Sequence, residues 1–221
     1  RRRWPFILLL LAVVPLLAFG MWWMKIRDEE ERAVRYALSD AELALLQDGD
    51  IILRRGSGMV SDMIAGMLNE DHDLSHCGIL VLRDGVFRVV HAVSNNISDH
   101  DGMQVHGLQE FVRQSRPGSL VVCRLRTDRD RSVISRRAIR YLKQRVPFDH
   151  HFDRTDSSSF YCSELPWRIL RDEFGVDIFA DAADGGLEAF RFGRFMDPRW
   201  FDVVLDHQKN RPERSALRPF F

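Results

Sequence analysis

Three residues, His76, His91 and Cys162, have the chemical character of a catalytic site. A cysteine thiolate attacks a carbonyl carbon when a neighbouring imidazole takes its proton and a third polar group orients that imidazole. We expect the two histidines on one face of a β-hairpin and Cys162 at the start of a helix. This arrangement predicts cleavage of an amide or ester bond through an acyl-cysteine intermediate.

The hairpin is predicted from two apolar runs, residues 77–82 and 86–93, that are separated by a turn containing Asp84-Gly85. Asp-Gly between apolar runs is a strong hairpin signal, and a two-residue loop pairs residue 83 with residue 86. In that register His91 lies opposite Gly78, and His76 is its diagonal neighbour on the same face, with Cα atoms roughly 7–8 Å apart. Because Gly78 has no side chain, one imidazole can lean toward the other. Two half-buried histidines that simply hydrogen-bond to each other are the alternative.

Cys162 stands where the polar loop of residues 157–159 changes into a helix, which Gly175 should end. Unpaired N–H groups and the dipole at a helix N-terminus favour a thiolate, and the N–H groups can also stabilise an oxyanion. Cys77 and Cys123 are expected to be inert core residues. A disulfide between those two is an open alternative, and it would indicate an oxidising compartment.

The elements around these residues mix strands and helices without strict alternation, which predicts an α+β fold. Ser39 to Glu42 has the spacing of a capping box and begins a short helix. The other expected strands span residues 50–53, 119–125 and 200–205, and the other expected helices span residues 58–68, 133–146 and 162–174.

The first 27 residues predict a membrane anchor. Twenty residues from Trp4 to Trp23 carry no charge, which is the length that a helix needs to cross the hydrocarbon layer, and tryptophans stand at both ends. A cleaved signal peptide is the alternative, because three arginines precede the run and residues 18–20 offer a cleavage spacing. We expect a single-pass protein of the bacterial inner membrane, bound to the lipid bilayer through residues 4–23, with its domain facing the periplasm.

Residues 28–47 are predicted to form a helical stalk, and residues 48–221 a single catalytic domain. Residues 28–221 hold 27 basic and 32 acidic residues, a net charge of −5, which argues against a nucleic-acid partner. Three cysteines in 221 residues exclude a disulfide-stapled miniprotein. Three clusters of histidines and acidic residues lack the spacing of zinc ligands and are expected in solvated loops; they span residues 71–76, 99–101 and 149–153.

Four short motifs, in one order, resemble those of a known family: GDIILRR from Gly49, SHCGILV from Ser75, VVHA from Val89 and FYCSEL from Phe160. They are similar to the strand, histidine, third-residue and nucleophile motifs of NlpC-type, papain-like cysteine hydrolases. Because the cysteine motif follows the histidine motif, the resemblance is to the circularly permuted branch, the YiiX/YaeF-type amidases and their lecithin–retinol acyltransferase relatives. It covers about residues 48–170.

This resemblance implies a permuted papain-like domain with an antiparallel sheet packed on helices. It also implies that Cys162 is the nucleophile, His76 the general base and then general acid, and His91 the residue that orients His76. Many permuted relatives have Glu at the position of His91, and a neutral imidazole stabilises an imidazolium less than a carboxylate does. The resemblance places Asp149 and Tyr161 at the substrate, and it implies no cofactor and no metal.

Two substrate classes stay open, namely lipids or small acyl amides, and peptide amides of cell-wall murein. A lipid substrate predicts an apolar channel that leads to Cys162, whereas a murein substrate predicts an open polar groove. Met59, Met63 and Met67 have helical spacing and are expected in the core, or alternatively in an apolar groove for an acyl chain. A non-catalytic, membrane-tethered binding or scaffold module on the same fold is the alternative function.

Overall fold

The computed structural model describes residues 14–16, 19–23, 36–182 and 186–209. Most of the predicted membrane segment, residues 4–23, and the first part of the predicted stalk lie outside these ranges. Among the residues that are described, no helix is both long and apolar enough to cross a bilayer. The membrane anchor therefore stays a prediction.

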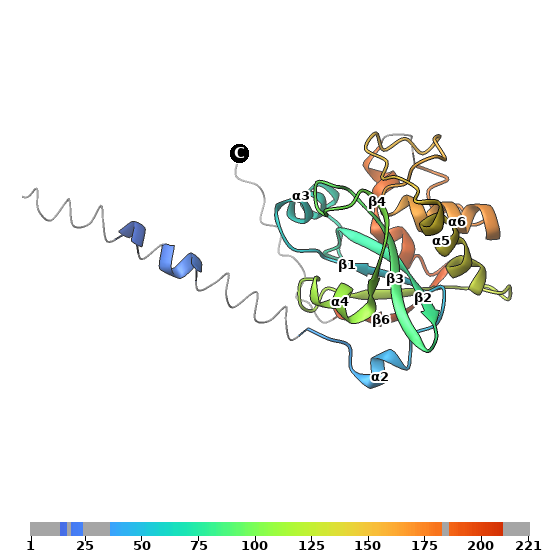
Figure 1. The fold of residues 1–221 in the computed structure, drawn as a ribbon, viewed down its shortest axis with the longest axis horizontal. Coiled ribbons are helices and arrows are strands. Elements are labelled where there is room, and N and C mark those ends of the chain that lie inside the picture. The colour runs from blue at the N-terminus through green and yellow to red at the C-terminus, as the bar shows by residue number, and fades with distance from the viewer. Residues whose placement is uncertain (1–13, 17–18, 24–35, 183–185, 210–221) are drawn as a thin grey trace, which may run out of the picture.

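A six-stranded antiparallel sheet lies at the centre of the domain, with the strand order β4-β3-β2-β1-β5-β6 (Figure 1). The strands are β1 (Ile51–Arg54), β2 (His76–Arg83), β3 (Val86–Val93), β4 (Gly102–Gly107), β5 (Val121–Leu125) and β6 (Phe201–Asp206). The sheet and its helices confirm the α+β class. Five of the strands lie where the sequence predicts them, whereas β4 was not expected.

Helices flank the sheet: α2 (Asp40–Leu43), α3 (Met59–Leu68), α4 (Leu108–Arg113), α5 (Ser132–Gln144) and α6 (Glu164–Phe174), with two 3-10 turns, η1 (Leu187–Phe190) and η2 (Phe192–Met196). The predicted capping box is present at the start of α2, where Ser39 and Glu42 bond each other's backbone N–H groups. Gly175 ends α6 in the left-handed conformation, as expected. The short α4 was not predicted.

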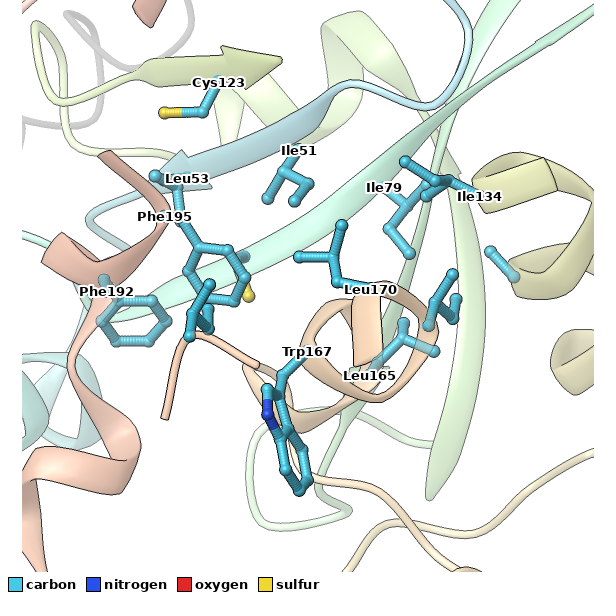
Figure 2. Close-up of a cluster of buried hydrophobic side chains, with 14 of the residues drawn as sticks. Ile51, Leu53, Ile79, Cys123, Ile134, Leu165, Trp167, Leu170, Phe192 and Phe195 are labelled. Carbon is cyan, nitrogen blue, oxygen red and sulfur yellow. The ribbon is translucent and has the colours of Figure 1, made fainter. Parts of the chain in front are cut away.

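Both faces of the sheet are buried. On one face, Ile51 and Ile79 pack with Leu165 and Leu170 of α6 and with Phe195 of η2 (Figure 2). On the other face, α4 packs on β1, β2 and β3 together with residues 38–46. The last part of the predicted stalk therefore packs on the domain and contributes to its second core.

Candidate active site

The hairpin that carries both histidines has the predicted register. Arg83 pairs with Val86, and both turn residues, Asp84 and Gly85, have positive φ, as the tight turn requires. Gly78 is needed for close approach: a β-carbon there would lie 2.5 Å from Val89 Cγ1 and 3.1 Å from His91 Cβ. No larger residue fits at this position without displacing Val89 or His91.

The structure brings His76 and His91 together and adds a third imidazole, that of His106. His76 Nε2 lies 2.7 Å from His91 Nδ1, and His91 Nε2 lies 2.7 Å from His106 Nδ1. His91 is buried, while His76 and His106 are partly exposed. Phe111 of α4 supports the row, because its ring lies 5.4 Å from the His91 ring and 6.0 Å from the His76 ring. The three imidazoles therefore form one hydrogen-bonded chain.

Sequence reasoning missed His106 because β4 was not predicted. Val89 pairs with His106, which makes His106 a diagonal neighbour of His91 on the same face of the sheet. The segment GMQVHG does show apolar and polar residues in alternation, but it has only six residues and glycine at both ends. That alternation was the available signal.

Cys162 immediately precedes the N-terminus of α6, where Ser163 is the N-cap residue. The turn is fixed by Glu164, which is fully buried, accepts from the Tyr161 N–H at 3.3 Å and pairs with Arg168 at 2.5 Å. Arg168 in turn donates to the Asp156 carbonyl oxygen at 2.7 Å, and so ties the preceding loop to the helix. These contacts hold the sulfur at a defined point beside the sheet.

The surroundings of Cys162 favour its thiolate. The pKa of Cys162 lies well below the usual value for a thiol, first because the Cys77 thiol hydrogen-bonds to it, and further because of the hydrogen bond and charge of His76 and the Ser163 N–H. Burial opposes this shift. Since His76 Nε2 is bonded to His91, Nδ1 is the nitrogen left to face the sulfur. A sulfur and an imidazole in hydrogen-bonding contact can form a thiolate–imidazolium pair.

Burial lowers the pKa of His91 well below its usual value, and the neighbouring charges of His76, Arg54 and His106 act in the same direction. His91 is therefore a neutral acceptor for His76. Burial also lowers the pKa of His76, while the Cys162 thiolate raises it. Of the two other cysteines, Cys123 is a buried core residue as expected, and Cys77 is buried with its sulfur 3.2 Å from the Cys162 carbonyl oxygen. All three thiols are free, so the disulfide alternative is wrong for this structure.

Two adjoining cavities meet at Cys162. The smaller has a volume of about 220 Å³ and is lined by Arg54, His76 and several serines. The larger has a volume of about 500 Å³ and a lining that is mostly apolar. Its apolar side chains are Val60, Met63, Ile64, Met67, Leu68, Ile97, Phe148, Phe152, Leu187, Phe190 and Phe192.

The methionine row of α3 is not in the core, because Met59, Met63 and Met67 are all exposed. Met63 and Met67 line the larger cavity, so the alternative of an apolar groove fits their positions. Tyr161 lines the same cavity. Asp149 lines neither: its buried carboxylate accepts from the backbone N–H groups of residues 151 and 153, and so organises its own loop.

The histidine and acidic clusters pair internally or with other side chains. Asp101 lies 3.0 Å from His150, and His72 lies 3.1 Å from Asp206. Within the described part of the chain, no group of three or more His, Cys, Asp or Glu side chains is arranged to hold a metal ion.

A cysteine at a helix N-terminus, facing a histidine on an antiparallel sheet, defines the papain-like class of hydrolases. The sequence of residues 45–182, more than half of the chain, matches the family described as permuted papain-like amidase enzymes, YaeF/YiiX, C92 family. The chain belongs to this family, which confirms the resemblance and supports hydrolase activity.

Among solved structures, the chain is similar to one described as metalloprotein yiiX from Escherichia coli O157:H7. The two share 27% sequence identity and a TM-score of 0.49, over 60% of this chain and 68% of that one. No curated protein matches the chain significantly.

Proposed function

We propose that this protein is a cysteine amidase or esterase whose substrate carries an apolar acyl group. The observation that carries this proposal is that Cys162 lines a mostly apolar cavity of about 500 Å³ and, together with His76, lines the smaller cavity beside it. We further propose that the protein is tethered to a membrane through residues 4–23, where such substrates are concentrated.

In the proposed reaction, the Cys162 sulfur attacks the carbonyl carbon of the substrate while His76 holds the thiol proton. The bond from carbon to the leaving nitrogen or oxygen breaks, and His76 passes the proton to that leaving group. The acyl group stays on sulfur as a thioester. Water then attacks the thioester, gives a proton to His76, and releases the carboxylic acid as the thiol is restored.

We assign the orienting role to His91, as the sequence predicts, and extend it to His106. When His76 is an imidazolium, its Nε2–H must donate to His91 Nδ1, so His91 has to carry its own proton on Nε2. That proton needs an acceptor, and His106 Nδ1 stands 2.7 Å away. His106 therefore favours the tautomer of His91 that accepts from His76.

The apolar lining also favours an acyl chain over a murein peptide, whose polar backbone would leave its hydrogen-bonding groups without partners in such a cavity. A non-catalytic scaffold would have no need for a partly exposed cysteine with a lowered pKa that faces a histidine.

Substrate chain length provides the test of the acyl cavity. For a series of soluble acyl amides, kcat/KM should rise about fourfold for each methylene group until the cavity is filled, since each buried methylene contributes about 0.8 kcal/mol. Met63→Glu places a charge in the cavity and should remove this dependence. Met59→Glu, on the same helix but lining neither cavity, should retain it. Equal rates for all chain lengths in the wild type would contradict the proposal.

The imidazole chain predicts graded losses of activity. His91→Ala should lower kcat by about 10- to 100-fold, the size expected for one hydrogen bond to a charged group, and therefore by less than Cys162→Ala does. His106→Leu removes the acceptor for His91 and should cause a smaller loss. His106→Asn offers an amide oxygen in its place and should recover part of that loss. If His106→Asn and His106→Leu have the same kcat, the tautomer role of His106 is wrong.

A further inference from the structure

Two neighbouring arginines at the end of β1 differ sharply in their partners. Arg55 is buried and forms ion pairs with Asp62 and Asp73. Arg54 donates from Nη1 to the Phe111 carbonyl oxygen at 2.8 Å, and its guanidinium lies 4.0 Å above the Phe111 ring. Its Nε is buried without a hydrogen-bond partner, and no carboxylate in the described part of the chain pairs with it. The guanidinium is therefore only partly hydrogen-bonded within the chain, and although the charge of the Cys162 thiolate acts on it, an anion from outside the chain can bind it as well.

Arg54 stands directly at the reaction centre. It pairs with His76 across β1 and β2, which places the two side chains on the same face of the sheet. It also lines the smaller cavity together with Cys162. Burial lowers the pKa of Arg54 to about 10, so it is still a cation at neutral pH.

The smaller cavity combines the Arg54 cation with both polar and apolar side chains. Four serines and one glutamine supply hydroxyl and amide groups, namely Ser57, Ser61, Ser75, Ser94 and Gln114, and the apolar part of the lining comes from Ile64, Ala92, Val93, Ile97 and Phe148. The cavity has less than half the volume of the apolar one, and the two share Cys162 at their junction. A substrate whose scissile bond lies at Cys162 would therefore place an apolar group in one cavity and a small polar group in the other.

We propose that Arg54 binds an anionic group on the leaving side of the substrate, so that the enzyme cleaves acyl amides whose amine portion carries a carboxylate or phosphate. This inference rests on the proposed function and names the substrate class of that site. A guanidinium presents paired N–H donors that match both of these anions, and a low-polarity setting strengthens the contact.

The same position gives Arg54 a second role to be distinguished from the first, because its charge also acts on the Cys162 thiolate. The two roles differ in what they predict. A cation that only stabilises the thiolate accelerates all substrates equally, whereas a cation that binds the leaving group discriminates between charged and neutral substrates. The ratio of kcat/KM between a charged and a neutral substrate therefore distinguishes the two roles.

The test compares N-decanoylglycine with N-decanoylglycinamide, which share the acyl chain and the scissile amide but differ in the carboxylate. The wild type should show kcat/KM about 10- to 100-fold higher for the glycine compound. Arg54→Met should bring that ratio close to one, and Arg54→Lys should keep part of it. Arg113→Met, which removes an exposed arginine of α4 that lines neither cavity, should leave the ratio unchanged.

The outcomes of this comparison separate the anion subsite from the proposed function. A wild-type ratio near one, with both compounds hydrolysed by a Cys162-dependent reaction, overturns the anion subsite and leaves the proposed function standing. A high ratio that Arg54→Met does not change, in a variant with wild-type thermal melting, also overturns it. Hydrolysis of neither compound contradicts the proposed function and the subsite with it. N-decanoyl-phosphoethanolamine in the same assay shows whether phosphate is accepted in place of carboxylate.

Discussion

Cys162→Ala is expected to abolish hydrolysis, lowering kcat/KM by about 10³-fold or more, because no other group in the proposed mechanism can form the covalent intermediate. Cys162→Ser should be almost as inactive, since a serine hydroxyl at this position lacks the lowered pKa that makes the thiol a nucleophile. The measurement is steady-state hydrolysis of an acyl amide by purified protein, with thermal melting to show that each variant is folded.

The matched control for this substitution is Cys123→Ala. Cys123 is fully buried in β5, so this variant should be less stable yet keep its activity. Full activity in Cys162→Ser would show that the reaction does not use the sulfur, and the cysteine-hydrolase account would then be wrong.

His76→Gln should lower kcat by about 10²- to 10⁴-fold, the usual contribution of a general acid–base group, and it should also raise the pKa of Cys162. The direction of this pKa change follows from the contacts of the Cys162 thiol. The His76 hydrogen bond and charge stabilise the thiolate, so their loss moves the ionisation of Cys162 to higher pH. In the wild type, alkylation of Cys162 by iodoacetamide should therefore reach half its maximum below the reference thiol value of about 8.5.

The pH profile of alkylation is measured for both proteins, with His100→Gln as the control, because His100 is exposed and lines neither cavity. The alkylation of the control should have the same midpoint pH as that of the wild type, whereas the midpoint pH of His76→Gln should be higher. Identical midpoints in all three proteins would mean that His76 does not act on Cys162.

The part of the site that depends on local signals could be predicted from the sequence. Asp84-Gly85 specifies a two-residue turn, and that turn alone fixes the register that brings His76 and His91 together. The capping box at Ser39 and the glycine that ends α6 are local signals of the same kind. The position of Cys162 beside His76 depends on a chain reversal of more than eighty residues, and here only the resemblance to a permuted family indicated the outcome.

Other features depend on contacts between distant parts of the chain. Helical spacing places Met59, Met63 and Met67 on one face of α3, but it does not tell whether that face meets a core or a cavity. Similarly, GDIILRR does not reveal which of its two arginines lacks a partner. That difference arises because Asp62 and Asp73 reach Arg55, while Arg54 turns onto Phe111 of α4.

The proposed acyl-cysteine intermediate can be observed directly by intact-mass measurement after brief incubation with an activated acyl ester, followed by peptide mapping. The mass is expected to increase by one acyl group, the group is expected on Cys162, and it should disappear on further incubation. Cys162→Ala should show no such increase. An unmodified protein, or a stable adduct on Cys77 while Cys162 stays free, would contradict the claim that Cys162 is the nucleophile.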